Sequence, residues 1–277
     1  MSLSPILLIL FVLFFVLLAL YRFSSGHKKA KTKNLQGLAA LTQLIDIIKL
    51  TQQHRGLYAG MINGQRVSQS NLQSIENQIN QNYKKLVNSE TQRDKSLKRF
   101  TLKSYNMWKS ILQNPSKDVN KSFHLHSSLI QRQLDCLWDI ADDFALTSHT
   151  DQNIQELAND LVRTLPKLTE AIGQVRAITL QVTHSKYCSA DKKLLLLFTL
   201  GKIQRDLAQV QPKLQKESYD KLYRFILEMT KSVEDQALSE RNPDTFFKEA
   251  SSHIDVIFSN IQTGLNDLKN QIGPQSN

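Results

Sequence analysis

Apolar residues recur every three or four positions along nearly the whole chain, and this spacing limits its fold more than any other feature. The first clear stripe contains Leu38, Leu41, Ile45 and Ile48, which fall on one face of an α-helix. The same spacing returns in later segments at about 72–86, 97–111, 123–144, 154–179, 200–214, 222–233 and 243–268. Only 9 Gly and 6 Pro occur in 277 residues, which disfavours a turn-rich β fold. The sequence therefore predicts an all-α protein.

The connections between these segments are short, so we expect about eight antiparallel helices arranged as two four-helix bundles over residues 35–273. Asn114-Pro115 predicts the end of the third helix, and Asn242-Pro243 predicts the start of the last, with Asn as N-cap. Pro166 lies inside the fifth segment and predicts a kink or break there. The run 194–198 is too short to cross a membrane and is interpreted as buried helix. Residues 274–277 are predicted to be a frayed tail.

The N-terminus carries a second strong signal. Residues 5–21 read PILLILFVLFFVLLALY, without a charge, which is near the lower length limit for a membrane-spanning helix. No basic residue precedes this run and no small-x-small cleavage site follows it, so we interpret it as an uncleaved anchor rather than a signal peptide. The predicted organisation is a transmembrane anchor at 1–23, a basic juxtamembrane linker at 24–34 and a helical domain at 35–273.

The basic residues are concentrated just after this anchor. The net charge is +10, and five of the basic residues lie at Arg22, Lys28, Lys29, Lys31 and Lys33. Basic residues next to a spanning helix prefer the cytoplasmic side and also suit anionic lipid headgroups. We therefore expect a single-pass protein of the bacterial inner (plasma) membrane with a cytoplasmic domain, a periplasmic domain being the alternative. No aromatic-basic platform for nucleic acid is visible, so no nucleic-acid partner is expected.

Two polar residues interrupt the first apolar stripe. Continued along the helix, the stripe passes through Gln52, Arg55, Ala59 and Ile62. A buried arginine cannot lose its proton, and leaving it unpaired costs on the order of several kcal/mol. Arg55 therefore needs an internal carboxylate or a bound anion, unless it is an ordinary solvated arginine. The adjacent Gly56 would allow a neighbouring element or a small ligand to approach closely.

A similar patch occurs in the fifth segment. Gly173 and Ala177 are four residues apart, and Arg176 lies between them at the border of the apolar stripe. Two planar guanidinium groups facing a small cavity would suit a small oxyanion such as nitrate. The candidate ligand-binding residues are therefore Arg55, Arg176, Gln52 and Gly56.

Other chemistry-bearing residues do not form a recognisable catalytic or metal site. Cys136 and Cys188 lie far apart, and His124 and His126 are two residues apart, which places them on different helix faces. There is no Gly-rich phosphate loop, GxSxG or HExxH motif. We expect neither an enzyme nor a metal or cofactor site.

The stretch 50–60, LTQQHRGLYAG, resembles the signature helix of the nitrate- and nitrite-sensing (NIT) domain family, whose usual form is Gln-x-Glu-Arg-Gly-Leu-Ser-Ala. The stretch 165–177, LPKLTEAIGQVRA, is similar to a later helix of such domains. The resemblance covers about residues 35–270 and implies a pair of four-helix bundles that binds nitrate or nitrite between arginines of different helices. It implies Arg55 and Arg176 as those arginines.

The chain departs from this pattern in two respects. His54 and Tyr58 replace the usual Glu and Ser, which leaves the identity of the ligand open. NIT domains usually precede an output module such as a kinase, a chemoreceptor hairpin, a cyclase or an RNA-binding antiterminator, whereas here the sensor-like region takes up nearly all residues. We therefore expect a membrane-anchored sensor that signals through a separate protein or a homodimer partner. The alternative is a scaffold that kept the bundle but lost ligand binding.

Overall fold

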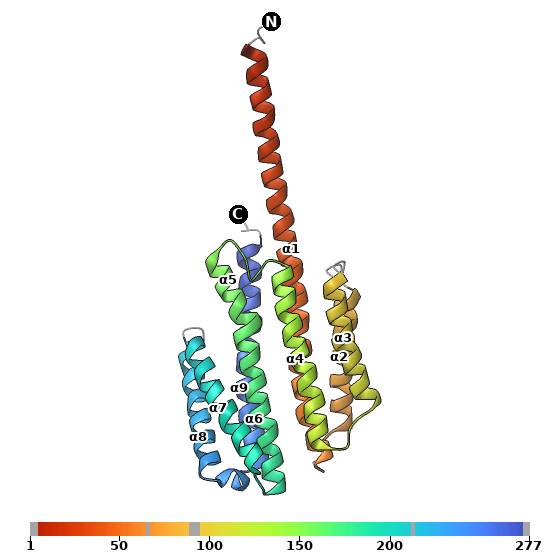
Figure 1. Ribbon diagram of the computed structural model, residues 1–277, viewed down its shortest axis with the longest axis vertical. Helices are drawn as coiled ribbons and strands as arrows, with labels where there is room; N and C mark the ends of the chain where they lie inside the picture. The colour runs from red at the N-terminus through yellow and green to blue at the C-terminus, as the bar shows by residue number, and fades with distance from the viewer. Residues whose placement is uncertain (1–4, 65–66, 89–94, 212–213, 274–277) are drawn as a thin grey trace.

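The computed structural model describes residues 5–64, 67–88, 95–211 and 214–273, and over these ranges the chain is helical and contains no strand (Figure 1). The prediction of an all-α protein is confirmed. The predicted tail at 274–277 lies outside the described residues.

The first bundle is formed by α1 (Pro5–Ile62), α2 (Gln69–Asn88), α3 (Lys95–Gln113) and α4 (Val119–Asp143). The C-terminal half of α1 packs against α2 and α4, and α3 closes the bundle by packing against the same two helices. The stripe residues Leu41, Ile45 and Ile48 are at most 1% exposed, as the 3–4 spacing predicts.

The second bundle begins with α5 (Gln152–Asn159), a π-helical turn (Asp160–Thr164) and α6 (Leu165–Ser185). It continues through α7 (Ala190–Val210), α8 (Lys216–Glu234), a 3-10 turn (Ala237–Glu240) and α9 (Pro243–Ile272). α6 packs against α7 and α9, and α8 packs against the same pair. The two bundles lie side by side with neighbouring helices antiparallel (Figure 1), which corresponds to the arrangement predicted from the short connections.

The inter-bundle interface is formed by α1 and α4 on one side and by α6 and α9 on the other. α6 buries nearly all of its residues, including those outside its apolar stripe, because helices pack around it from both bundles. Polar side chains on α6 therefore face other helices instead of water and must find hydrogen-bond partners within the protein.

Local sequence signals position the helix ends. Asn242 is the N-cap of α9, where its Oδ1 accepts a hydrogen bond from the backbone N–H of Thr245 at 3.0 Å, and Pro243 follows at the first helical position. A kink or break was predicted at Pro166, and the structure has no break there: the helix continues from α5 through the π-helical turn (Asp160–Thr164) into α6, and the turn is a local irregularity just before the proline. Proline has no N–H to donate, so the regular hydrogen-bond ladder is interrupted and a wider turn replaces it.

The interpretation of 194–198 as buried helix is wrong for most of its residues. Leu196 is fully buried, but Leu194 and Phe198 are each 68% exposed. α7 contacts α6 and α8 and lies at the edge of the bundle (Figure 1). A run of consecutive apolar residues covers all sides of a helix, so part of it faces outward.

The predicted anchor and linker form one continuous helix with the bundle part of α1. Residues 1–4 and the side chains of 5–10, 12, 23 and 27 lie outside the described part. From Pro5 the helix projects well beyond the bundle (Figure 1), and its large apolar side chains are exposed, with Phe11 at 62% and Leu20 at 59%. The part of the chain that the structure describes contains no helix that meets the length and apolarity required to span a membrane.

Candidate functional site

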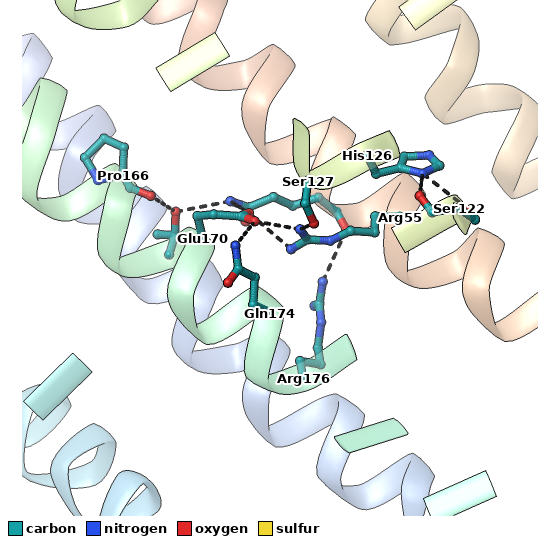
Figure 2. Close-up of polar contacts among 10 residues, drawn as sticks. Arg55, Ser122, His126, Ser127, Pro166, Glu170, Gln174 and Arg176 are labelled. Atoms are coloured by element: carbon teal, nitrogen blue, oxygen red, sulfur yellow. Dashed lines mark hydrogen bonds and ion pairs between the residues drawn. The ribbon is translucent and has the colours of Figure 1, made fainter. Parts of the chain in front are cut away.

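The four candidate residues come together at the inter-bundle interface. Gln52, Arg55 and Gly56 are buried on α1, and Arg176 is buried on α6. Gln52 and Arg55 are each 1% exposed and Arg176 is 4% exposed. The interruption of the apolar stripe therefore marks a buried polar cluster (Figure 2), in which the two arginines have different partners.

Arg55 is neutralised by an internal carboxylate. Its Nη1 donates to Glu170 Oε1 at 2.6 Å and to Ser127 Oγ at 2.9 Å, and its Nη2 donates to Glu170 Oε2 at 3.1 Å (Figure 2). Parallel hydrogen bonds of this kind are the strongest contact between an arginine and a carboxylate. Of the two solutions that the sequence left open for Arg55, the structure contains the internal carboxylate.

Glu170 was not among the candidates, yet it is the centre of the cluster. It is 5% exposed and also accepts hydrogen bonds from Gln52 Nε2 at 3.1 Å and Gln174 Nε2 at 3.0 Å. Glu170 lies outside the apolar stripe of α6, so helical spacing alone did not indicate its burial. The signal that was available is the requirement of Arg55 for an anion.

Arg176 has a different environment. Its Nη1 donates to Ser251 Oγ at 2.7 Å, its Nη2 donates to the carbonyl of Gln52 at 3.3 Å, and its guanidinium lies over the ring of Phe247 at 4.9 Å. Among the described residues, none of its hydrogen-bond partners is a carboxylate. Burial and the neighbouring charge of Arg55 lower the pKa of Arg176 to about 10, so it remains a cation at neutral pH.

Two glycines make room for these guanidinium groups. A Cβ atom on Gly173 of α6 would lie 2.7 Å from Arg55 Nη2, and one on Gly56 of α1 would lie 3.4 Å from Arg176 Nη2. Each helix therefore provides a glycine opposite the arginine of the other helix. Gly56 was predicted to allow a close approach of a neighbouring element or ligand. In the structure, guanidinium groups make this approach, that of Arg176 at Gly56 and that of Arg55 at Gly173.

A cavity of about 380 Å³ lies beside Arg176, between the two bundles. Arg55, His54 and Tyr58 are not among its lining residues. At its wall, Lys49 Nζ lies 3.1 Å from Asp255 Oδ1. The side-chain Oε1 of Gln52 is buried and has no hydrogen-bond partner among the described residues. The cavity is lined by residues of α1, α2, α6 and α9, which include Lys49, Gln52, Ile75, Gln78, Arg176, Phe247, Ser251 and Asp255.

Within the described residues, no three His, Cys, Asp or Glu side chains are grouped so that they could hold a metal ion. The cavity instead presents a guanidinium group, an aromatic ring and amide and hydroxyl groups, with one lysine–aspartate pair at its wall. Such a set can bind a small anion through hydrogen bonds and charge.

The comparisons with known proteins identify a fold. No protein-family model matches the chain, and the search of curated proteins finds no match. Among solved structures, the chain is similar to the structure of the NasR transcription antiterminator, with a TM-score of 0.70 and 12% sequence identity. The match covers 93% of this chain and 74% of that one. At this identity the similarity shows a shared helical fold.

Proposed function

We propose that this chain is a membrane-anchored sensor whose helical domain binds a small oxyanion of the nitrate or nitrite type at Arg176. The observation that carries the proposal is a buried cation that lines a cavity and whose hydrogen-bond partners among the described residues are all neutral. An uncompensated buried charge is costly, and an anion in the cavity would offset that cost. The resemblance of residues 50–60 to the NIT signature helix supports the same ligand class.

The charges around the cavity favour an anion with one negative charge. Arg55, Arg176 and Lys49 contribute three positive charges, and Glu170 and Asp255 contribute two negative ones, which leaves a net charge of +1. A singly charged planar oxyanion balances this charge, and its oxygens match the planar fork of a guanidinium. We therefore expect nitrate or nitrite to bind better than sulfate.

The Arg176 guanidinium would be the main hydrogen-bond donor to this ligand. The hydroxyl of Ser251 accepts from Arg176 and donates its own hydrogen to the carbonyl of Phe247 at 2.6 Å. Ser251 therefore orients the guanidinium and has no hydrogen left for a ligand. Arginine has five N–H groups, so donors remain available beyond the bonds to Ser251 and Gln52.

The location of the cavity supplies a mechanism for sensing. Its walls come from α1 and α2 of the first bundle and from α6 and α9 of the second, so a bound anion would contact both. Higher affinity for one packing of the bundles than for another would shift the population toward that packing. We propose that a separate protein or a second copy of the chain responds to this shift.

The anchor remains part of the proposal. It is supported by the apolar run at 5–21, by the exposure of side chains such as Phe11 and Leu20, and by the basic residues that follow. We propose a location in the bacterial plasma membrane with the bundles in the cytoplasm, and a periplasmic location as the alternative. Reporter fusions to the C-terminus, one active only in the cytoplasm and one only in the periplasm, distinguish the two.

The first experiment measures the melting temperature of the 277-residue chain in mild detergent, with millimolar nitrate or nitrite and with chloride and sulfate at equal ionic strength. A ligand that binds only the folded state raises its stability. We expect a rise with nitrate or nitrite in the wild type and its loss in Arg176→Gln. Arg224→Gln, at an exposed arginine of α8, is the matched control and should keep the rise. The absence of a rise in the wild type, or an equal rise in Arg176→Gln, would contradict anion binding at this site.

A scaffold without ligand binding is the second candidate. It is favoured by the Arg55–Glu170 pair, which joins the bundles without any ligand. It predicts that a partner protein binds the chain with the same affinity with and without nitrate or nitrite, whereas the sensor predicts that the anion changes this affinity.

A further inference from the structure

A chain of three hydrogen bonds crosses the core of the first bundle and joins α4, α1 and α2. The carbonyl oxygen of Ser122 lies 2.8 Å from Nδ1 of His126, and Figure 2 draws the contact between these two residues. Nε2 of His126 lies 2.9 Å from Nδ1 of His54. Nε2 of His54 lies 3.2 Å from Oε1 of Glu76. Both imidazoles are only 1% exposed, so the middle of this series of hydrogen bonds is shielded from water.

These three hydrogen bonds need more protons than two neutral histidines carry. Each of the three contacts needs one proton between its two atoms. A neutral imidazole carries one N–H, so two neutral histidines supply two protons. The carbonyl of Ser122 and an ionised Glu76 supply none. One additional proton must therefore be bound, either by a histidine or by Glu76.

The position of this proton follows from the two groups at the ends of the hydrogen-bond series, the Ser122 carbonyl and the Glu76 carboxylate. Nδ1 of His126 faces two oxygens of Ser122, the carbonyl at 2.8 Å and the hydroxyl Oγ at 3.5 Å. The nearer carbonyl can only accept, so Nδ1 donates to it. Burial, the neighbouring His54 and Arg55 lower the pKa of His126 to about 3, so His126 is neutral and its Nε2 accepts from His54. Nδ1 of His54 is thus a donor, and the additional proton lies between Nε2 of His54 and Glu76.

We propose that His54 and Glu76 form a buried proton-binding site that joins α1 to α2 in the folded protein and releases its proton as the pH rises. The inference goes beyond anion sensing and does not depend on it. Once the proton is lost, a nitrogen lone pair faces a carboxylate, and the contact becomes repulsive. The side chain of Glu76 is 28% exposed, so it can turn toward water, which separates it from α1.

Among the described residues that contact His54, none besides Glu76 supplies a counter-charge for this proton. On α1, Arg55 is paired with Glu170, and the pKa of Tyr58 is raised by burial and by Glu76, so its hydroxyl stays neutral. On α3, the uncharged Trp108 ring lies edge-on to His54 at 4.9 Å. On α4, His126 is neutral. Glu76 is therefore the carboxylate that holds the proton together with His54.

The site adjoins the cavity described above. Ile75 and Gln78, on either side of Glu76 in the sequence of α2, line that cavity, and His54 immediately precedes Arg55. Where the proposed anion binding holds, a change in protonation would alter one wall of the cavity. The proton-binding site itself is testable without any anion.

The test measures how the folding equilibrium constant depends on pH, by denaturant unfolding in detergent. It compares this dependence between the wild-type 277-residue chain and Glu76→Gln. Above the ordinary histidine pKa of about 6.5, the unfolded chain carries two protons on these groups and the folded chain carries three. Wild-type stability should therefore be highest near pH 6.5 and fall above it, by up to tenfold in the equilibrium constant per pH unit, until the site loses its proton. Below about pH 6.5 the unfolded chain binds a further proton at His126, whose pKa in the folded chain is lowered to about 3, so stability also falls toward acid pH. Glu76→Gln should remove the fall above pH 6.5, because the amide donates permanently to the neutral Nε2 of His54.

The matched control is Glu217→Gln, the same chemical change at an exposed glutamate of α8, which should keep the wild-type fall. A second measurement needs no variant: ¹⁵N spectra of the histidine rings at pH 7.5 should show His126 neutral and protonated at Nδ1. They should also show His54 with two N–H groups, or with one N–H group when the Glu76 carboxyl is protonated. The proposal is overturned if wild type and Glu76→Gln have the same pH dependence, or if both rings are neutral and Glu76 is ionised in the folded wild type.

Discussion

Arg55 of α1 and Glu170 of α6 form a two-point ion pair across the inter-bundle interface, with N–O distances of 2.6 and 3.1 Å. Both residues are at most 5% exposed, so neither charge is compensated by water when the other is removed. The pair connects the helix that projects from the bundles with the central helix of the second bundle. Its loss should affect stability strongly.

Replacing Glu170 with Gln should lower the free energy of unfolding by about 3–5 kcal/mol, because the guanidinium of Arg55 would remain buried without its counter-charge. Denaturant unfolding at pH 7 measures this change. Glu217→Gln removes a carboxylate from the exposed contact with Lys221 and should leave the stability nearly unchanged. Equal stability of the two variants would show that water compensates Arg55 in solution.

Replacing Gly173 with Ala should lower stability by about 1–3 kcal/mol, because overpacking a filled site forces its neighbours to move. The new Cβ would lie 2.7 Å from Arg55 Nη2, and the Glu170 and Ser127 contacts restrict how far this group can retreat. Gly201→Ala is the control on α7, where the nearest atom is 3.7 Å away at the end of Arg205. It should raise stability by about 0.5–1 kcal/mol through helix propensity. A stabilising Gly173→Ala variant would show that Arg55 adapts easily.

The apolar period was sufficient to predict the helices and the buried position of Arg55, because a 3–4 spacing reports which residues of one helix share a face. It was not sufficient to predict the partners of Arg55. Glu170 and Ser127 are 115 and 72 residues away in the sequence, and spacing within one helix carries no information about which residue of another helix lies opposite.

The two arginines illustrate the same limit. Both were expected to face one small cavity, and in the structure only Arg176 lines it, while Arg55 is turned to Glu170. The exposed Leu194 and Phe198 were misjudged because apolar composition does not reveal whether a helix is central or at the edge of a bundle. His54 was noted only as a departure from a motif, and its partners on α2 and α4 became visible only in three dimensions.

The two cysteines should differ in reactivity toward a thiol-alkylating reagent in the folded protein. Cys136 is 1% exposed and burial raises the pKa of its thiol to about 12, whereas Cys188 is partly exposed and its pKa is raised less strongly. The thiolate is the reactive form. Mass spectrometry should therefore find Cys188 labelled at pH 8 long before Cys136. Labelling of both at equal rates would show that α4 opens readily from the first bundle.

Asp255→Asn and Lys49→Gln should change anion binding in opposite directions, if the cavity binds a singly charged anion. The first variant removes a negative charge from the cavity wall and the second removes a positive one. Both groups are partly exposed, so each change in stability should stay below about 1 kcal/mol. The nitrate- or nitrite-dependent rise in melting temperature should increase in Asp255→Asn, decrease in Lys49→Gln, and differ less between the variants at high ionic strength, where charges are screened. A shift of both variants in the same direction would mean that the geometry of the wall, and not its charge, controls binding.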